Sequence, residues 1–252
     1  MNLPVPPEIL FAAKPIERLN AARALPDDVR RQVCCHWPRD FPQAHGARNA
    51  WLITVGPSPG LGKSRRKAGQ ISTTTELPSL GTPCEFFRTW CTRFGSTLLA
   101  VVERAFAKAG LDSDAARSLF LHINLNLTLA GLEARIPEGD LGAGLPRLRL
   151  VIQEVKPRLI VALTRTVYRV ISNGFAQGKI LQGATVGAQV THKEETGGRL
   201  YSWDTCLVKC PGFDPILVTG VLQHPSRAST VKDYKGVVGD YLASCVGQFE
   251  DS

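Results

Sequence analysis

The chain has 252 residues, which is long enough for the buried core of one large α/β domain or two small ones. Hydrophobic residues make up 44% of the chain and charged residues 21%. Lysine and arginine outnumber aspartate and glutamate by 30 to 22, and the net charge of +8 suits a polyanionic partner such as nucleic acid, although many basic soluble proteins have no such partner. No apolar run approaches the roughly 18 residues of a membrane-spanning helix, and the first residues lack the basic and apolar regions of a secretory signal. We therefore expect a protein that does not contact a membrane.

The seven cysteines are irregularly spaced, and their odd number argues against a disulfide framework. This pattern is typical of reduced thiols, and we therefore expect a cytoplasmic protein. No Cys-x2-Cys pair occurs, and the nearest approaches to one are Cys34-Cys35 and Cys206-x3-Cys210, which give little support for an iron–sulfur cluster. We therefore expect no metal and no cofactor.

Short apolar runs alternate with helical patterns along most of the chain. In order, the sequence predicts an N-terminal extension (1–48), a buried strand (51–55), a long polar loop (57–84), a helix (95–110), a strand within 119–129, a helix (146–155), a strand (158–163), a helix (167–175), a hairpin or loop (182–201), a strand (216–221) and a closing helix (233–249). Strands that alternate with helices favour a parallel sheet with helices on both faces. We therefore expect residues 49–252 to form one three-layer αβα domain around a central, mostly parallel four-stranded sheet.

Three motifs lie at the ends of three of the predicted strands. They are Gly56-Pro57-Ser58-Pro59-Gly60, Leu121-His122-Ile123-Asn124-Leu125-Asn126 and Leu222-Gln223-His224-Pro225-Ser226-Arg227. Parallel sheets bind their ligands beyond the carboxyl ends of the strands. All three motifs are therefore expected at one edge of the sheet.

Together the three motifs resemble those of the uracil-DNA glycosylase superfamily, and the resemblance extends over about residues 49–241. It implies a hydrolase that flips a base out of DNA and cleaves the bond between base and sugar, leaving an abasic site. It further implies a monofunctional enzyme with no metal and no lysine Schiff base, the αβα fold described above, and a monomer.

In the first motif the resemblance assigns Gly56 and Pro59 to the base pocket. Much of the superfamily has Asp or Asn at the third position, where it positions the attacking water, but this chain has Ser58. A serine can hold a water by a hydrogen bond but is not a base at neutral pH. The loop that follows offers Glu76 and Glu85 as acidic alternatives. We take Ser58 and Glu85 as the catalytic candidates of this region.

The fifth position of the first motif is Gly60, where uracil-specific members have a tyrosine that excludes a substituent at C5 of the base. Glycine leaves that space open unless another side chain fills it, which favours a 5-substituted pyrimidine.

The base also needs an aromatic face on which to stack, and Phe87 is the candidate, with Phe86 as the alternative. Either phenylalanine could equally belong to the core.

In the second motif the resemblance assigns Asn124 to the Watson–Crick edge of the base, because an amide can donate and accept at once. Asn126, two residues further along the same face of the strand, is the alternative, and a strand-end asparagine can also simply cap a turn.

The third motif is the closest match. His224 would donate a hydrogen bond to the pyrimidine O2 as negative charge develops there.

Basic and small polar residues near the motifs are candidates for contacts with DNA phosphates. They are Lys63, Arg65, Arg66, Ser226 and Arg227. A solvated charged loop would have the same composition.

Gly62-Lys63-Ser64 also resembles the end of a P-loop, but Pro57 stands where the first glycine is required. Proline has neither the backbone N–H nor the conformational freedom of that glycine.

The leading hypothesis is a DNA glycosylase acting on one of two substrates. One is uracil, in base-excision repair. The other is a 5-substituted or hypermodified pyrimidine, such as the modified cytosine of phage DNA, in antiviral defence, and Ser58 and Gly60 favour this second substrate. The alternative is a catalytically silent superfamily member that binds nucleic acid, and a weaker one is an unrelated nucleotide-processing enzyme.

Overall fold

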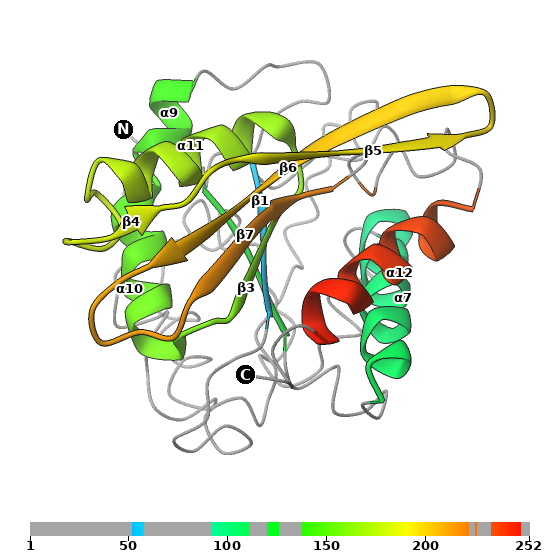
Figure 1. Cartoon of the computed structure of the whole chain (residues 1–252), viewed down its shortest axis with the longest axis horizontal. Coiled ribbons are helices and arrows are strands. Elements are labelled where there is room, and N and C mark those ends of the chain that lie inside the picture. The colour runs from blue at the N-terminus through cyan, green and yellow to red at the C-terminus, as the bar shows by residue number, and fades with distance from the viewer. Residues whose placement is uncertain are drawn as a thin grey trace, which may run out of the picture.

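The structure is a computed structural model, shown in Figure 1, and it describes residues 52–57, 92–110, 120–125, 138–221, 225 and 233–247. The predicted N-terminal extension lies outside the described residues, as does almost all of the predicted polar loop. The division of the chain at residue 48 therefore stays a prediction.

Four parallel strands form the part of the sheet that the sequence predicts. They are β1 (Leu52–Gly56), β2 (Phe120–Asn124), β3 (Leu159–Ala162) and β7 (Ile216–Gly220), in the order β2-β1-β3-β7. Every residue of β1 and β3 is buried, as expected for parallel strands covered on both faces. The prediction of a parallel sheet from the apolar runs is confirmed for these strands.

The sheet is larger than predicted, because three antiparallel pairings extend it beyond β7. They involve β4 (Thr185–Val186), β5 (Val190–Thr196) and β6 (Arg199–Lys209), and the sheet has seven strands in all. The sequence predicts a hairpin or loop over residues 182–201, and a hairpin forms there. Gly197 and Gly198 make its two-residue turn with positive φ at both positions, as the right-handed twist of a hairpin requires. β6, however, continues far beyond the predicted segment and joins the hairpin to β7.

Helices cover both faces of the sheet (Figure 1). One face carries α9 (Glu138–Gly142), α10 (Leu145–Val155) and α11 (Arg165–Ala176), and the other carries α7 (Thr92–Lys108) and α12 (Tyr234–Gly247). Two separate hydrophobic clusters result, with Ile53 and Val55 in the first and Leu52 in the second. Because the side chains of a strand alternate between faces, β1 contributes to both clusters. The three-layer αβα architecture is thus present in the described part of the chain.

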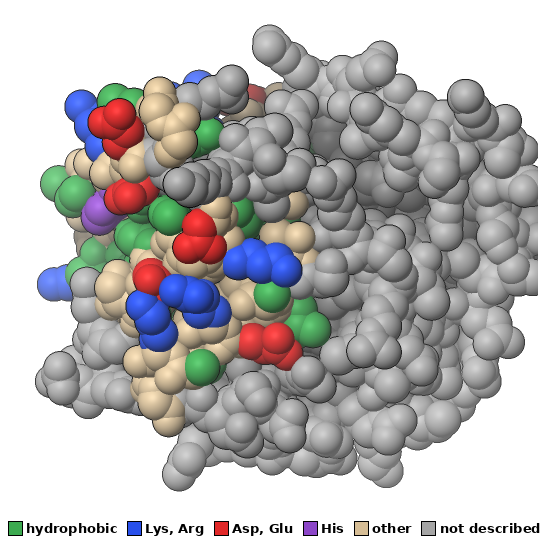
Figure 2. Space-filling model, turned by 90° about the vertical axis from the view of Figure 1, so that its right-hand side faces the viewer, with side chains coloured by type: hydrophobic (Ala, Val, Ile, Leu, Met, Phe, Trp, Pro, Cys, Tyr) green, Lys and Arg blue, Asp and Glu red, His purple; other side chains and the backbone are tan. Residues whose placement is uncertain are grey.

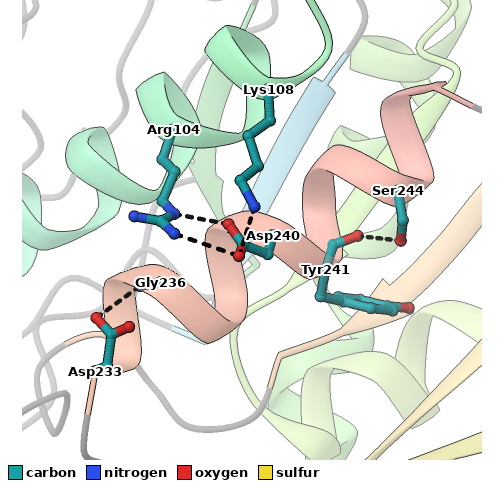
Figure 3. Close-up of polar contacts among 7 residues, drawn as sticks. All are labelled: Arg104, Lys108, Asp233, Gly236, Asp240, Tyr241 and Ser244. Atoms are coloured by element: carbon teal, nitrogen blue, oxygen red, sulfur yellow. Dashed lines mark hydrogen bonds and ion pairs between the residues drawn. The ribbon is translucent and has the colours of Figure 1, made fainter.

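An exposed ion-pair network joins α7 to α12 (Figure 3). Asp240 on α12 accepts from Arg104 Nε at 2.7 Å and lies 2.7 Å from Lys108 Nζ. These hydrogen bonds to the Arg104 guanidinium and the Lys108 ammonium lower the pKa of Asp240 to about 2. The network links the two helices, but because its side chains are more than 40% exposed its contribution to stability is small.

No helix in the described ranges is both long and apolar enough to cross a membrane.

Candidate active site at the carboxyl edge of the sheet

The first two motifs meet at the carboxyl ends of β1 and β2. The parallel register pairs Gly56, the last residue of β1, with Asn124, the last residue of β2. The amide of Leu125 donates to the carbonyl oxygen of Gly56 at 3.0 Å, so the pairing continues one residue past the strands. Of the two asparagines in the second motif, Asn124 is therefore the one at the level of Gly56, and Asn126 lies outside the described residues.

Gly56 makes room for the carboxamide of Asn124. A Cβ atom built on Gly56 would collide with Asn124 Oδ1 and would lie 3.4 Å from Asn124 Cγ. The carboxamide thus occupies the space that any other residue at position 56 would fill, and the Asn124 side chain is only 4% exposed. The glycine of the first motif and the asparagine of the second are a matched pair across two strands.

A buried polar pair supports these two residues one step further into the sheet. Thr54 Oγ1 donates to the carbonyl oxygen of Leu121 at 3.1 Å and lies 3.0 Å from His122 Nδ1. A hydroxyl has a single hydrogen, so with Thr54 donating to Leu121 the second contact is assigned to the Nδ1–H of His122, which donates to Thr54 Oγ1. The His122 ring also reaches the site, because its Cε1 lies 3.3 Å from the position of a Cβ on Gly56.

Sequence reasoning missed the role of Thr54 and His122. Both are almost fully buried, and each stands two residues before a predicted site residue, on the same face of its strand. The signal was present as two polar residues, one in each of two apolar strands. A buried polar residue in an apolar run needs a partner, and here each is the partner of the other.

A close backbone contact holds the end of β2. A Cβ on Gly144, the residue that precedes α10, would overlap the carbonyl group of Leu125. The start of α10 therefore packs directly against the residue that follows Asn124. This contact limits how far the end of β2 can move away from β1.

The third motif follows β7, and the described residues on either side of it are firmly held. Thr219 Oγ1 donates to the carbonyl of Gly220 at 3.0 Å, so the phenol of Tyr241 on α12 is the donor in its 2.8 Å hydrogen bond to Thr219. Burial raises the pKa of Tyr241, which keeps this donor protonated. Pro225 of the motif is buried. The bond between Thr219 and Tyr241 ties the strand before the motif to the helix after it.

The helix after the third motif begins at a capped turn (Figure 3). Asp233, at φ 47°, accepts from the amide of Gly236 at 3.2 Å through its carboxylate. A side-chain cap of this kind satisfies one amide of the first helical turn. The start of α12 is therefore set by its own sequence, while Tyr241 ties the middle of the helix to β7.

Of the predicted site residues, the structure describes Gly56 and Asn124 and brings them together. The other predicted residues lie outside the described part of the chain: Ser58, Pro59, Gly60, Lys63, Arg65, Arg66, Glu85, Phe87, His224, Ser226 and Arg227. The alternatives Glu76 and Phe86 lie outside it as well.

The described cysteines cannot form one metal cluster. Cys206 and Cys210 belong to the core on the α11 face of the sheet, and Cys245 belongs to the core on the α12 face. Four residues of strand separate Cys206 from Cys210 by about 13 Å, too far for two ligands of one cluster. Burial raises the pKa of the Cys206 thiol and that of Cys245, the latter to about 11. Within the described ranges there is no group of three or more side chains suited to hold a metal ion.

No protein-family model matches this sequence, and comparison with curated proteins found no match. The functional interpretation therefore depends on the three motifs and on the geometry of the carboxyl edge.

Proposed function

We propose that this protein is a DNA glycosylase that extrudes a pyrimidine from DNA and hydrolyses the bond between the base and its sugar. The observation that supports this proposal best is the register of Gly56 with Asn124. Two motifs 68 residues apart in the sequence are adjacent in space, with a carboxamide at the carboxyl edge where a ligand of a parallel sheet is expected.

Asn124 suits the recognition of a base edge. Its amide can donate one hydrogen bond and accept another, as a pyrimidine edge requires. Gly56 removes the side chain that would displace the carboxamide, and the Thr54–His122 pair stiffens the floor below it. A recognition group held by packing loses little conformational entropy on binding.

In the proposed reaction the bond between C1′ of the sugar and N1 of the base breaks, and its electron pair stays with the base. Negative charge then builds on O2, where His224 would donate a hydrogen bond. Water adds its oxygen to C1′, one of its protons is released, and the departing base takes up a proton. Ser58 would position this water, and Glu85 is the candidate to accept its proton.

The proposed substrate is a pyrimidine with a substituent at C5. Gly60 stands where a tyrosine ring would block such a group, and the basic residues Lys63, Arg65, Arg66 and Arg227 would bind the phosphates around the target. Removal of such a base fits antiviral defence, and removal of uracil would fit repair.

The test uses matched duplexes that contain uracil, 5-hydroxymethylcytosine or only ordinary bases at one position. We expect release of a free base and an alkali-labile site from a modified duplex, with no effect of a chelator. Asn124→Ala should lower the single-turnover rate about a hundredfold. Asn173→Ala removes the same amide from an exposed position on α11 and should leave the rate unchanged. Loss of activity with chelator, or an Asn124 variant as fast as wild type, would reject the proposal.

Ser58 supports a second candidate, a silent superfamily member that binds nucleic acid without cleaving it. Such a protein lacks the acidic or amide group that commonly positions water. It would bind the duplexes in the same experiment but release no base from any of them.

A further inference from the structure

The polar side chains closest to the candidate site lie inside the molecule rather than on its surface. On the face shown in Figure 2, described acidic and basic side chains are interspersed with apolar ones. Thr54, His122 and Asn124, by contrast, are each at most 4% exposed. Buried polar groups are held in a fixed geometry by their partners, so these three side chains are where the structure can control the site.

These side chains share one face of the sheet with Gly56. His122 and Asn124 are two residues apart on β2, as Thr54 and Gly56 are on β1, and residues with this spacing point to the same face of a strand. The register pairs His122 with Thr54 and Asn124 with Gly56. Leu52, two residues before Thr54, belongs to the core on the α12 face. The four positions therefore form one block of neighbours on that face.

The imidazole of His122 is held at its Nδ1 end. Thr54 Oγ1 donates to the carbonyl of Leu121 at 3.1 Å and accepts from His122 Nδ1–H at 3.0 Å. Thr54 is thus bonded to two consecutive residues of the neighbouring strand. A buried ring fixed at one nitrogen within a close-packed interior has little freedom to turn.

The His122 ring borders the carboxamide of Asn124. The position of a Cβ on Gly56 lies 3.3 Å from His122 Cε1 and 3.4 Å from Asn124 Cγ, and it overlaps Asn124 Oδ1. The ring and the carboxamide therefore border the same space above Gly56. If the ring turned or withdrew, the carboxamide would gain room on the side that faces into the sheet, and its orientation would no longer be fixed from below.

The same contacts favour one orientation of the carboxamide. Oδ1 is the atom of Asn124 nearest to the Cβ position of Gly56, and Nδ2 is no nearer to it than Cγ is. Gly56 Cα and His122 Cε1, which lie beside this space, carry C–H groups. Such groups make weak favourable contacts with an oxygen but offer no acceptor to an NH2 group. The oxygen is therefore favoured toward Gly56, and the NH2 group is turned away from it.

We propose that His122 is a positioning residue that, held by Thr54, fixes the carboxamide of Asn124 in one orientation. This inference rests on the proposed function for the role of Asn124 in binding a base. A carboxamide with one orientation presents its donor and acceptor in one order. It therefore distinguishes a 4-keto from a 4-amino pyrimidine, whose edges have donors and acceptors interchanged. Loss of the bond between Thr54 and His122 should reduce this discrimination as well as the rate.

A second histidine–threonine pair provides the matched control. His192 Nε2 lies 3.0 Å from Thr205 Oγ1, and Thr205 also donates to the carbonyl of Val190, so the hydroxyl has the same two kinds of partner as that of Thr54. Both threonines are buried, and three strand spacings separate β6, which contains Thr205, from β1. Thr54→Val and Thr205→Val thus remove the same hydroxyl, once beside Asn124 and once far from it.

The first measurement needs no substrate. The side-chain amide of Asn124 gives a pair of proton–nitrogen NMR signals, which are identified by their absence in Asn124→Ala. We expect Thr54→Val to shift or broaden this pair, and Thr205→Val to leave it unchanged. Thr54→Ser keeps the hydroxyl and should restore the wild-type signals. If the pair stayed unmoved in folded Thr54→Val, the positioning role would be wrong.

A second variant tests the ring itself and decides the matter if Thr54→Val does not fold. His122→Asn keeps an N–H near the position of Nδ1 but removes the rest of the ring. Because the ring is what borders the carboxamide, we expect His122→Asn to move the Asn124 signals even where thermal unfolding shows an intact fold. Wild-type signals in this variant would overturn the inference.

The third measurement is selectivity. Single-turnover base release is compared on matched duplexes that contain 5-hydroxymethyluracil or 5-hydroxymethylcytosine, which differ in the keto or amino group at C4. We expect the wild type to prefer one of them, and Thr54→Val and His122→Asn to lower that preference about tenfold. Thr54→Ser and Thr205→Val should keep it. A wild-type preference near one, or equal losses on both substrates in Thr54→Val, would contradict the positioning role.

The measurements separate this inference from the proposed function. If Thr54→Val moves the Asn124 signals but the wild type releases no base from any duplex, the proposed function fails and the positioning of Asn124 stands. If the wild type releases base while Thr54→Val changes neither the signals nor the preference, the proposed function stands and the positioning role fails.

Discussion

Replacing Gly56 with alanine should disturb the carboxamide of Asn124 more than it disturbs the fold. The added Cβ would overlap Asn124 Oδ1 and approach His122 Cε1 to 3.3 Å. Overpacking a buried site lowers the free energy of unfolding by about 1–3 kcal/mol. Replacing a glycine whose φ is not positive raises it by about 0.4–1 kcal/mol, because the unfolded chain then has fewer conformations to lose. We therefore expect a net loss of about 1–2 kcal/mol, a fall in Tm of roughly 2–8 °C.

The effect on activity should be much larger, because the carboxamide must rotate or shift to escape the new methyl group. Misplacing a positioning group by about 1 Å can lower a rate about a hundredfold. The assays are urea unfolding and single-turnover base release, with Gly220→Ala as the control. Gly220 likewise ends a parallel strand, but a Cβ there would meet Trp203 Cβ at an ordinary 3.4 Å. If Gly56→Ala released base as fast as wild type, Asn124 would not be the recognition group, and the reasoning from this pair would fail.

Four other predictions concern the candidate site and the α7–α12 pair. Thr54→Val removes the acceptor of the buried Nδ1–H of His122 and should lower the free energy of unfolding, measured in urea, by about 1–3 kcal/mol. An unchanged urea midpoint would contradict the assigned hydrogen bond. His224→Ala should slow single-turnover release by about 10²–10³ with little change in DNA affinity, and a near-normal rate would remove it from the chemistry. Gly60→Tyr should suppress release of a 5-substituted pyrimidine more than release of uracil, and equal losses would mean that Gly60 does not line the C5 side of the pocket. The pKa of Asp240 is lowered to about 2 by its cationic partners on α7, so its stabilising effect is full above pH 4 and is lost as pH falls toward 2. Asp240→Asn should therefore lower stability at pH 7 by less than about 1 kcal/mol and have less effect at pH 2, and an equal effect at both would contradict the assigned ion pairs.

The parallel half of the sheet was readable from the sequence because its strands are continuous apolar runs. Leu52 to Val55 and Leu159 to Ala162 are buried on both faces and contain almost no polar residue. The antiparallel half was harder, since β5 has Lys193, Glu194 and Glu195 in succession and no apolar residue after Val190. Its strand character comes from pairing with β6 and from the Gly197–Gly198 turn. The helix α9 was also missed, because two of its five residues are glycine.

The site was readable only in part. The sequence placed Gly56 and Asn124 at strand ends and favoured Asn124, but it kept Asn126 as an alternative. That choice depends on a register between strands 68 residues apart, which local patterns do not contain. The Thr54–His122 hydrogen bond was invisible for the same reason.

The β5–β6 hairpin also bears on how this molecule could diversify. On the turn side of Thr205 the hairpin pairs with no other described strand, so it could lengthen or shorten at its turn without disturbing the strands that carry Gly56 and Asn124. Residues added at the turn leave the root in register, whereas a single residue added to each strand at the root would turn the side chains that now face α12 toward α11. The length of the hairpin and the chemistry at the sheet edge could thus evolve independently of one another.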